Sequence, residues 1–251
     1  MELLIGVLFF IYGLIFGSFF NVVGLRVPKK ASISFPPSHC TACERRLGVL
    51  DLVPVFSYLF LKGRCRTCSA KISPIYPFME LMTGILFALA YGMLGLSLEL
   101  IVAIVFISLL IIITVTDLAY MLIPNKILFP FGIVLFLLRF ISPLTPWWSS
   151  IVGAVIGFGV LLVIAVISKG GMGGGDIKLF LVIGLVIGPV QTLLTLFIAS
   201  LIGTIVGFIF LKRTKQGRKT PIPFGPSISA AAVIVYFWGS FIVDWYGKLF
   251  V

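Results

Sequence analysis

Residues 150–188 read SIVGAVIGFGVLLVIAVISKGGMGGGDIKLFLVIGLVIG. Two apolar runs flank a break that holds five glycines and a single carboxylate, Asp176. Glycine loses the most conformational freedom on folding and packs no side chain, so a glycine run between apolar segments needs a reason, such as the close approach of another backbone. A carboxylate near a bilayer is costly and usually functional. A flexible turn between two membrane helices is the simpler reading, but such a turn would not need Asp176.

The composition of the whole chain is that of a membrane protein. Of 251 residues, 60% are hydrophobic and 11% are charged, and the mean hydropathy is +1.22, which is too apolar for a soluble globular domain. Met1-Glu2 gives no basic start to a signal peptide, and the first apolar run continues past Phe20 without a small-residue cleavage site. We therefore expect an all-α polytopic membrane protein whose first span is retained.

Apolar runs divide the chain into predicted spans. Six runs are long enough to cross about 30 Å of hydrocarbon, at 3–23, 78–96, 99–116, 150–167, 191–211 and 224–243. Two shorter runs lie at 127–141 and 177–188. We expect about eight transmembrane helices, divided into a first helix (1–23), a cytoplasmic insert (24–77) and a membrane domain of about seven helices (78–251).

The basic residues predict the orientation of these spans. With the N-terminus outside, the inner loops hold 17 of the 19 lysines and arginines, and only Arg139 and Lys248 fall elsewhere. Cytoplasmic loops carry such an excess of positive charge. We therefore expect a multi-pass protein of the cytoplasmic membrane with both termini outside. Topology accounts for the net charge of +11, so we predict the lipid bilayer and not nucleic acid as the partner of this charge.

The predicted insert carries all four cysteines, as Cys40-x2-Cys43 and Cys65-x2-Cys68. Two such pairs at this separation are typical of tetrahedral thiolate zinc sites. Disulfides are the alternative, but thiols stay reduced in the cytoplasm. Four thiolates leave no open coordination position, which favours a structural Zn²⁺ that supplies folding energy to a segment too small to bury a core. His39, the only histidine, is interpreted as an exposed neighbour of the site.

Two aspartates are predicted to reach the inner membrane face from different helices. Asp117 lies at the inner end of the third predicted span, and Asp176 at the inner end of the sixth. A carboxyl pair that shares one proton can hydrolyse a peptide bond, because one group takes a proton from water while the other donates to the scissile carbonyl. Each aspartate precedes one of the two short runs. Short runs either thin the bilayer or begin below its surface, and the second case would place both aspartates at depth beside a hydrated cavity.

The glycines offer a path for the substrate. An extended peptide backbone lying along Gly173, Gly174 and Gly175 would meet no side chains next to Asp176. Lys178 cannot share a helix face with Asp176 and is interpreted mainly as an inner-surface anchor. Glu80, about one turn inside the second span, either has a partner or reaches back to the surface. We include Lys178 and Glu80 with the three glycines as candidate substrate-binding residues.

These motifs resemble those of the bacterial type IV prepilin peptidases, a G-x-G-D family of intramembrane aspartic proteases. The resemblance rests on Asp117 with Ile123-Pro124-Asn125 and on Gly173-Gly174-Gly175-Asp176-Ile177-Lys178. It extends over nearly the whole chain, through Gly17-Ser18-Phe19 with Asn21-Val22, Arg26 and Pro28, the four-cysteine insert, Tyr76-Pro77 with Glu80, and Pro223-Phe224-Gly225-Pro226. The G-x-G-D element alone is weak, because presenilin-like proteases share it, but the conjunction is specific.

The resemblance implies an activity. Family members remove the short basic leader of prepilins and pseudopilins after a glycine, then methylate the new N-terminal residue with S-adenosylmethionine. By this resemblance Asp117 and Asp176 are the catalytic dyad and the four cysteines hold zinc in a bacterial inner-membrane enzyme. The chain departs from the family pattern at Ile75, where an arginine is common, and it shows no motif for the methyl donor.

Three other readings fit part of the pattern. A proton-coupled transporter would use the same inner-face carboxylates, but transporters commonly show inverted repeats, and none is visible here. A non-catalytic, metal-dependent sensor would keep the fold without the reaction. An archaeal preflagellin peptidase is the near neighbour within the family, and the cysteine insert argues against it.

Overall fold

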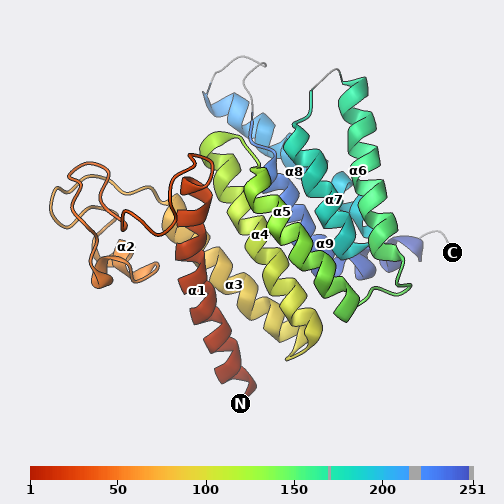
Figure 1. The fold of residues 1–251 in the computed structure, drawn as a ribbon, viewed down its shortest axis with the longest axis horizontal. Helices are drawn as coiled ribbons and strands as arrows, with labels where there is room; N and C mark the ends of the chain where they lie inside the picture. Colours follow the sequence, from red (N-terminus) through yellow and green to blue (C-terminus); the bar gives the residue numbers. More distant parts are fainter. Residues whose placement is uncertain (169–170, 215–221, 249–251) are drawn as a thin grey trace. The chain divides into compact units, whose positions relative to one another are not determined.

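The computed structural model describes residues 1–168, 171–214 and 222–248, and the regular elements in these ranges are all helices (Figure 1). The break at 169–178 therefore begins outside the described residues, with Lys169 and Gly170, and so do the inner-loop residues Lys215, Arg218 and Lys219. The helices, in chain order, are α1 (Glu2–Arg26), η1 (Val49–Asp51), α2 (Phe56–Phe60), α3 (Ile75–Leu94), α4 (Leu98–Tyr120), α5 (Asn125–Ile141), α6 (Ser149–Ile167), α7 (Gly174–Ile187), α8 (Pro189–Thr214) and α9 (Gly225–Gly247).

Each predicted apolar run coincides with a helix, so the all-α membrane fold is confirmed. Six of the helices have the length and composition of a membrane span, namely α1, α3, α4, α6, α8 and α9. The two shorter predicted runs form α5 and α7, which have 17 and 14 residues. At 1.5 Å per residue they are about 26 and 21 Å long, shorter than the hydrocarbon core of about 30 Å. The predicted number of eight spans is therefore not confirmed.

The chain forms two compact units, Met1–Val115 and Thr116–Val251. In the first unit, α1 packs along α3 through glycines. A Cβ at Gly13 would lie 2.6 Å from the Cα of Gly84, and a Cβ at Gly17 would lie 2.8 Å from the Cα of Glu80. Small residues of this kind let the backbones of two membrane helices approach closely. The glycines of the first span are therefore packing residues.

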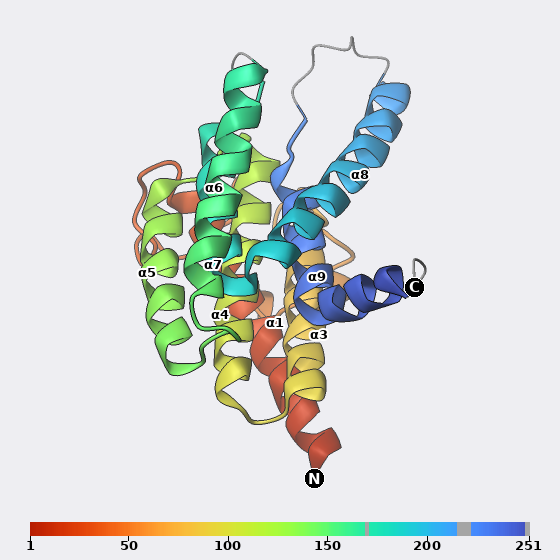
Figure 2. The same ribbon diagram turned by 90° about the vertical axis from the view of Figure 1, so that its right-hand side faces the viewer.

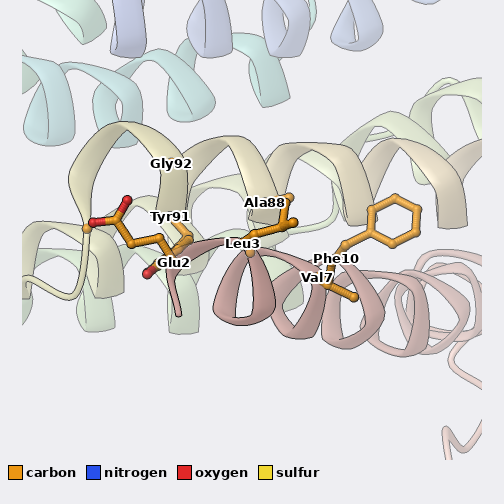
Figure 3. Close-up of a pocket in the computed structure, with 9 residues that line it drawn as sticks. Glu2, Leu3, Val7, Phe10, Ala88, Tyr91 and Gly92 are labelled. Atoms are coloured by element: carbon orange, nitrogen blue, oxygen red, sulfur yellow. The ribbon is translucent and has the colours of Figure 1, made fainter.

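A cavity of about 500 Å³ lies where the first turns of α1 meet the last turns of α3 (Figure 3). Its lining is mostly apolar, with Leu3, Val7 and Phe10 on α1 and Ala88 and Tyr91 on α3. Glu2 is its only carboxylate, so the cavity lacks the paired acids that the predicted chemistry requires.

In the second unit, α6 and α7 lie side by side and antiparallel (Figures 1 and 2). A Cβ at Gly153 would collide with the carbonyl oxygen of Gly184, and a Cβ at Gly157 with that of Phe180. The Gly-x3-Gly pair of α6 thus brings the two backbones into direct contact. This contact fixes how far each helix can slide along the other.

The contact also shows where Asp176 lies relative to the end of α6. From Gly153, α6 continues for 14 residues to Ile167, whereas from Gly184, α7 extends back for 10 residues to Gly174. The first turn of α7 therefore begins about 6 Å short of the end of α6. Asp176 is two residues further in. The start of α7 is therefore recessed relative to the end of α6, and its place below the bilayer surface stays a prediction.

Arg139 links the carboxyl-terminal ends of the two short helices, α5 and α7. This residue of α5 is buried, and its Nε and Nη2 donate to the carbonyl oxygen of Val186 in α7, at 3.0 and 2.6 Å. Its Nη1 donates to the carbonyl oxygen of Ser142, at 3.0 Å. The last carbonyls of a helix carry partial negative charge, so a guanidinium is well placed there.

Candidate active site and metal centre

Asp117 is buried in the last turns of α4 and is held by the start of α9. Its Oδ2 accepts a hydrogen bond from the backbone N–H of Gly225, at 2.7 Å. Gly225 is the first residue of α9, where N–H groups have no partner within the helix. A Cβ at Gly225 would lie 2.8 Å from Oδ2 and 2.9 Å from the Cβ of Asp117. The carboxyl group therefore occupies the space that a side chain at position 225 would need.

The residue before Gly225 is fixed in a similar way. A Cβ at Gly203 of α8 would lie 2.7 Å from the ring of Phe224. Phe224 therefore packs directly on the backbone of α8, while Gly225 packs on Asp117 of α4. The Pro223-Phe224-Gly225-Pro226 turn joins three helices and fixes the direction of the N–H that meets Asp117.

Asp176 lies in the first turn of α7. Its carboxyl group accepts a hydrogen bond from the backbone N–H of Gly173, the residue that caps the helix. This is half of a capping box, in which an acidic third residue satisfies the N-cap N–H. The carboxyl groups of Asp117 and Asp176 lie close enough for their negative charges to interact. The structure thus brings the two predicted aspartates together within one unit.

The three glycines before Asp176 have different surroundings. A Cβ at Gly173 would lie 3.0 Å from Oδ2 of Asp176, and one at Gly175 would lie 2.7 Å from the Cβ of Ile123. A Cβ at Gly174 would meet nothing within 4 Å. Gly175 therefore lets α7 pack against the Ile123-Pro124-Asn125 turn, and Gly174 is the member of the set that faces open space.

Lys178 and Glu80 both have partners. Lys178 Nζ donates to Oδ1 of Asn125, at 3.1 Å, which links α7 to the first residue of α5. Glu80 is buried, its Oε2 accepts from the N–H of Val55, at 2.7 Å, and its carboxyl group also bonds to the side chain of Ser18. These contacts support the alternative in which Glu80 has a partner, and its depth relative to the membrane surface stays a prediction. Glu80 belongs to the amino-terminal unit, whereas Lys178 belongs to the unit of the two aspartates.

The four cysteines form two matching turns. In each turn the N–H of the first cysteine donates to the carbonyl oxygen five residues on, Arg45 in one and Ala70 in the other, at 2.9 Å. The residue after the second cysteine has a positive φ in both turns, 54° at Glu44 and 56° at Ser69. The two Cys-x2-Cys segments therefore share one backbone conformation, which was not predicted from the sequence.

The sulfur positions fit a tetrahedral zinc ion. All four Sγ atoms lie within 4.8 Å of one another. Cys40 and Cys68 are 3.7 Å apart at sulfur, and Cys43 and Cys65 are 4.0 Å apart. A Zn–S bond of about 2.3 Å gives a tetrahedral edge of about 3.8 Å. All four are free cysteines, so the disulfide alternative is not realised.

Backbone N–H groups favour the thiolate form of one of the four cysteines, Cys65. The N–H groups of Cys68 and Thr67 lower the pKa of the Cys65 thiol to about 6, and a thiolate is the form that binds metal. The imidazole of His39 is exposed, and its Nδ1 lies 3.1 Å from the carbonyl oxygen of Pro37. His39 is not part of the cysteine cluster, in agreement with its predicted role as a neighbour.

Sequence reasoning missed the residues that hold the aspartates in place. In the sequence, Gly225, Asn125 and Ile123 stand out only as parts of motifs. A signal for Gly225 was present, because Pro223 and Pro226 carry no N–H, which leaves only Phe224 and Gly225 to donate to a partner at this helix start. Nothing in the sequence indicated that this partner would be Asp117, 108 residues earlier.

Comparisons with known proteins match both parts of the chain. Residues 11–94 match the bacterial peptidase A24 N-terminal domain, and residues 104–208 match the type IV leader peptidase family. A "Prepilin leader peptidase/N-methyltransferase" of Bacillus subtilis (strain 168) is 46% identical, over 96% of this chain and 97% of the relative. A protein of the same name from Aeromonas salmonicida (strain A449) is 32% identical, over 95% and 92%. One from Klebsiella pneumoniae is 36% identical, over 78% and 90%.

No solved structure matches the chain. The sequence similarity is nevertheless sufficient to assign the family, because these relatives are aligned over most of their own length and over most of this chain. The chain belongs to the type IV leader peptidase family.

Proposed function

We propose that this protein removes the leader from type IV prepilins or pseudopilins, cutting after a glycine at the cytoplasmic face, and then N-methylates the new N-terminal residue. The names of its relatives support this pair of activities, and they do not support a transporter. The single observation that supports the peptidase half is the electrostatic interaction between Asp117, in the last turns of α4, and Asp176, in the first turn of α7.

In this proposal the two carboxyl groups share the acid and base roles. One takes a proton from the attacking water while the other donates a proton to the scissile carbonyl oxygen. The N–H of Gly225 holds Oδ2 of Asp117. We assign the other oxygen, Oδ1, to the attacking water. The N–H of Gly173 holds the Asp176 carboxyl group in the same manner. Both acids are thus oriented by main-chain donors at helix starts, which need no reorganisation during the reaction.

The substrate backbone passes beside Gly174, since this is the glycine whose missing side chain leaves open space. Gly173 and Gly175 line the same turn, and their own contacts set its shape. We propose that Lys178 supports this turn through its hydrogen bond to Asn125. Glu80 supports the insert through Val55, and its expected contact with substrate stays a prediction.

Two cofactors belong to the proposal. Cys40, Cys43, Cys65 and Cys68 would hold a structural Zn²⁺ in the insert, residues 24–77, where it stabilises the fold without taking part in the reaction. S-adenosylmethionine would supply the methyl group for the second activity. We also propose that the basic loops lie in the cytoplasm and that both termini lie outside. The protease domain comprises residues 78–251.

The test is mass spectrometry of a prepilin substrate of the Bacillus subtilis relative, co-expressed with this chain. We expect loss of the leader together with the mass gain of one methyl group. Asp117→Asn and Asp176→Asn should each abolish leader loss while the protein still inserts in the membrane, because an amide can neither act as base nor share the proton. Asp244→Asn, at an exposed carboxylate near the end of α9, is the matched control and should cleave normally. Normal turnover by either dyad variant would refute the assignment.

A further inference from the structure

The cysteine insert exposes a run of large apolar side chains that its own fold does not cover. These residues lie in and around η1 and α2, within residues 49–60, which we name the anchor segment. Exposed fractions are 84% for Val49, 71% for Leu50, 63% for Leu59 and 84% for Phe60. Side chains of this size gain free energy when they leave water, so a surface of this kind indicates a partner.

The anchor segment is also hollowed. A groove of about 240 Å³ is lined by Leu50, Val53, Phe56, Phe60 and Leu61, with Arg66 in its wall. The one carboxylate in the segment, Asp51, is turned inward and paired with Arg45 and Arg66. The exposed cations Lys62 and Arg64 follow directly after α2. An apolar groove next to positive charge matches a molecule that has a hydrocarbon part and an anionic part.

A hydrogen bond ties the segment to the first turns of a candidate membrane span. The N–H of Val55, just before α2, donates to Oε2 of Glu80, at 2.7 Å. Glu80 is five residues beyond the start of α3, a candidate membrane span, which corresponds to about 7–8 Å along the helix axis. Amphipathic helices that lie on a bilayer bury their apolar face by about 5–10 Å.

The backbone of Val55 has an unfavourable conformation. Val55 has a φ of 62°, which is unfavourable for a β-branched residue. The carboxylate of Glu80, itself bonded to Ser18 of α1, keeps Val55 in this conformation. The direction of α2 is therefore fixed by the two membrane helices of its own unit, and not by the metal turns alone.

We propose that residues 49–60 are an interfacial membrane anchor, whose apolar side chains enter a phospholipid bilayer while the neighbouring cations bind anionic headgroups. The chain that carries the segment enters from α1 and continues into α3, so a bilayer is within reach at both ends. The charge selects anionic over zwitterionic lipid. The anchor holds the cysteine insert flat against the membrane. This inference does not depend on the enzymatic activity.

The experiment uses the full chain in lipid nanodiscs and a photo-crosslinking phenylalanine analogue, p-benzoylphenylalanine, at Phe60. The matched control carries the same analogue at Phe35, which lies in the same insert and is 74% exposed but falls outside the anchor segment. Mass spectrometry then identifies what each position has captured. We expect lipid adducts at Phe60 and little or none at Phe35, with more adduct in discs that contain phosphatidylglycerol than in discs of phosphatidylcholine alone.

A second variant tests the apolar contact without the analogue. Leu59→Ser with Phe60→Ser changes only exposed side chains, so the melting temperature in detergent should not change. Backbone amides of residues 49–60 should lose their protection from hydrogen exchange in phosphatidylglycerol nanodiscs.

Equal lipid labelling at Phe35 and Phe60, or capture by Phe60 of a second copy of the chain or of a prepilin in place of lipid, would overturn the anchor. Equal adduct yields in the two lipid compositions would overturn the role of charge.

Discussion

The carboxyl group of Asp117 at the end of α4 accepts its hydrogen bond from the first backbone N–H of α9, at Gly225. This link, with an N···O distance of 2.7 Å, ties a catalytic candidate to a residue that has no side chain. A Cβ at position 225 would lie within 3.0 Å of three atoms of Asp117. The position therefore has a direct consequence for activity that can be measured.

We expect Gly225→Ala to slow leader cleavage on the order of 100-fold, because the added methyl group displaces the Asp117 carboxyl group and misplacements of about 1 Å cost that much. The fall should appear in kcat with KM nearly unchanged, since the residue acts through Asp117 and not on the substrate. Gly159→Ala in α6 is the matched control, because a Cβ there meets nothing within 4 Å. A Gly225→Ala enzyme with the turnover of Gly159→Ala would show that Asp117 does not depend on this contact.

The glycines before Asp176 should separate into two classes. Gly175→Ala places a methyl group 2.7 Å from the Cβ of Ile123, so it should lower both the melting temperature and the cleavage rate, at a cost of roughly 1–3 kcal/mol. Gly174→Val enters open space and should slow cleavage while the melting temperature stays the same. If Gly174→Val cleaved at the normal rate, the substrate backbone would not pass along this turn.

The metal content of the insert provides a third test. The purified protein should contain one zinc ion per chain, and Cys→Ser at any of the four cysteines should lower both the zinc content and the melting temperature of the insert, since a structural site contributes folding free energy. Ser57→Ala, also in the insert but outside the cysteine cluster, is a control that should keep the metal. Protein that has never met a chelator and yet carries no metal would contradict the zinc site.

Asp51 gives the insert a predictable response to pH. Burial raises the pKa of its carboxyl group, but the N–H of Gly48 and the guanidinium groups of Arg66 and Arg45 outweigh burial, so the pKa lies below its ordinary value. A lowered pKa stabilises the fold above the unfolded pKa of about 3.9, and this stabilisation is lost as pH falls through the folded value. The difference in melting temperature between the natural protein and Asp51→Asn should therefore stay constant from pH 7 to about pH 5. A difference that shrinks within this window would mean that the pKa is raised.

Arg139 should matter for stability and not for chemistry. Arg139→Met leaves the carbonyl oxygen of Val186 without its two guanidinium donors, which should lower the free energy of unfolding by about 1–3 kcal/mol. Val186 is 10 residues from Asp176 along α7, so kcat of the folded fraction should not change. The comparison is Lys248→Met, at an exposed lysine, which should have no effect on either quantity. An equal loss of stability in both variants would contradict this stabilising role of Arg139.

Arg139 and Gly175 show what the sequence could and could not predict. Hydrophobic runs predicted every long helix, because a segment apolar enough to enter lipid has to satisfy its backbone hydrogen bonds within itself, as a helix does. Arg139 stood out as an exception to the positive-inside pattern, but its burial against Val186 depends on a contact 47 residues away. Likewise, the role of a glycine depends on what lies opposite. Gly174 and Gly175 are neighbours in the same run, and only the packing of Ile123 distinguishes them.

The direct contact between the backbones of α6 and α7 also restricts how a substrate can arrive. At Gly153 and Gly157 the backbones leave no room between the two helices even for a Cβ. At the level of these two glycines the seam between α6 and α7 therefore cannot hold an extended chain. Under the proposed function, the substrate reaches Asp176 from another side of α7.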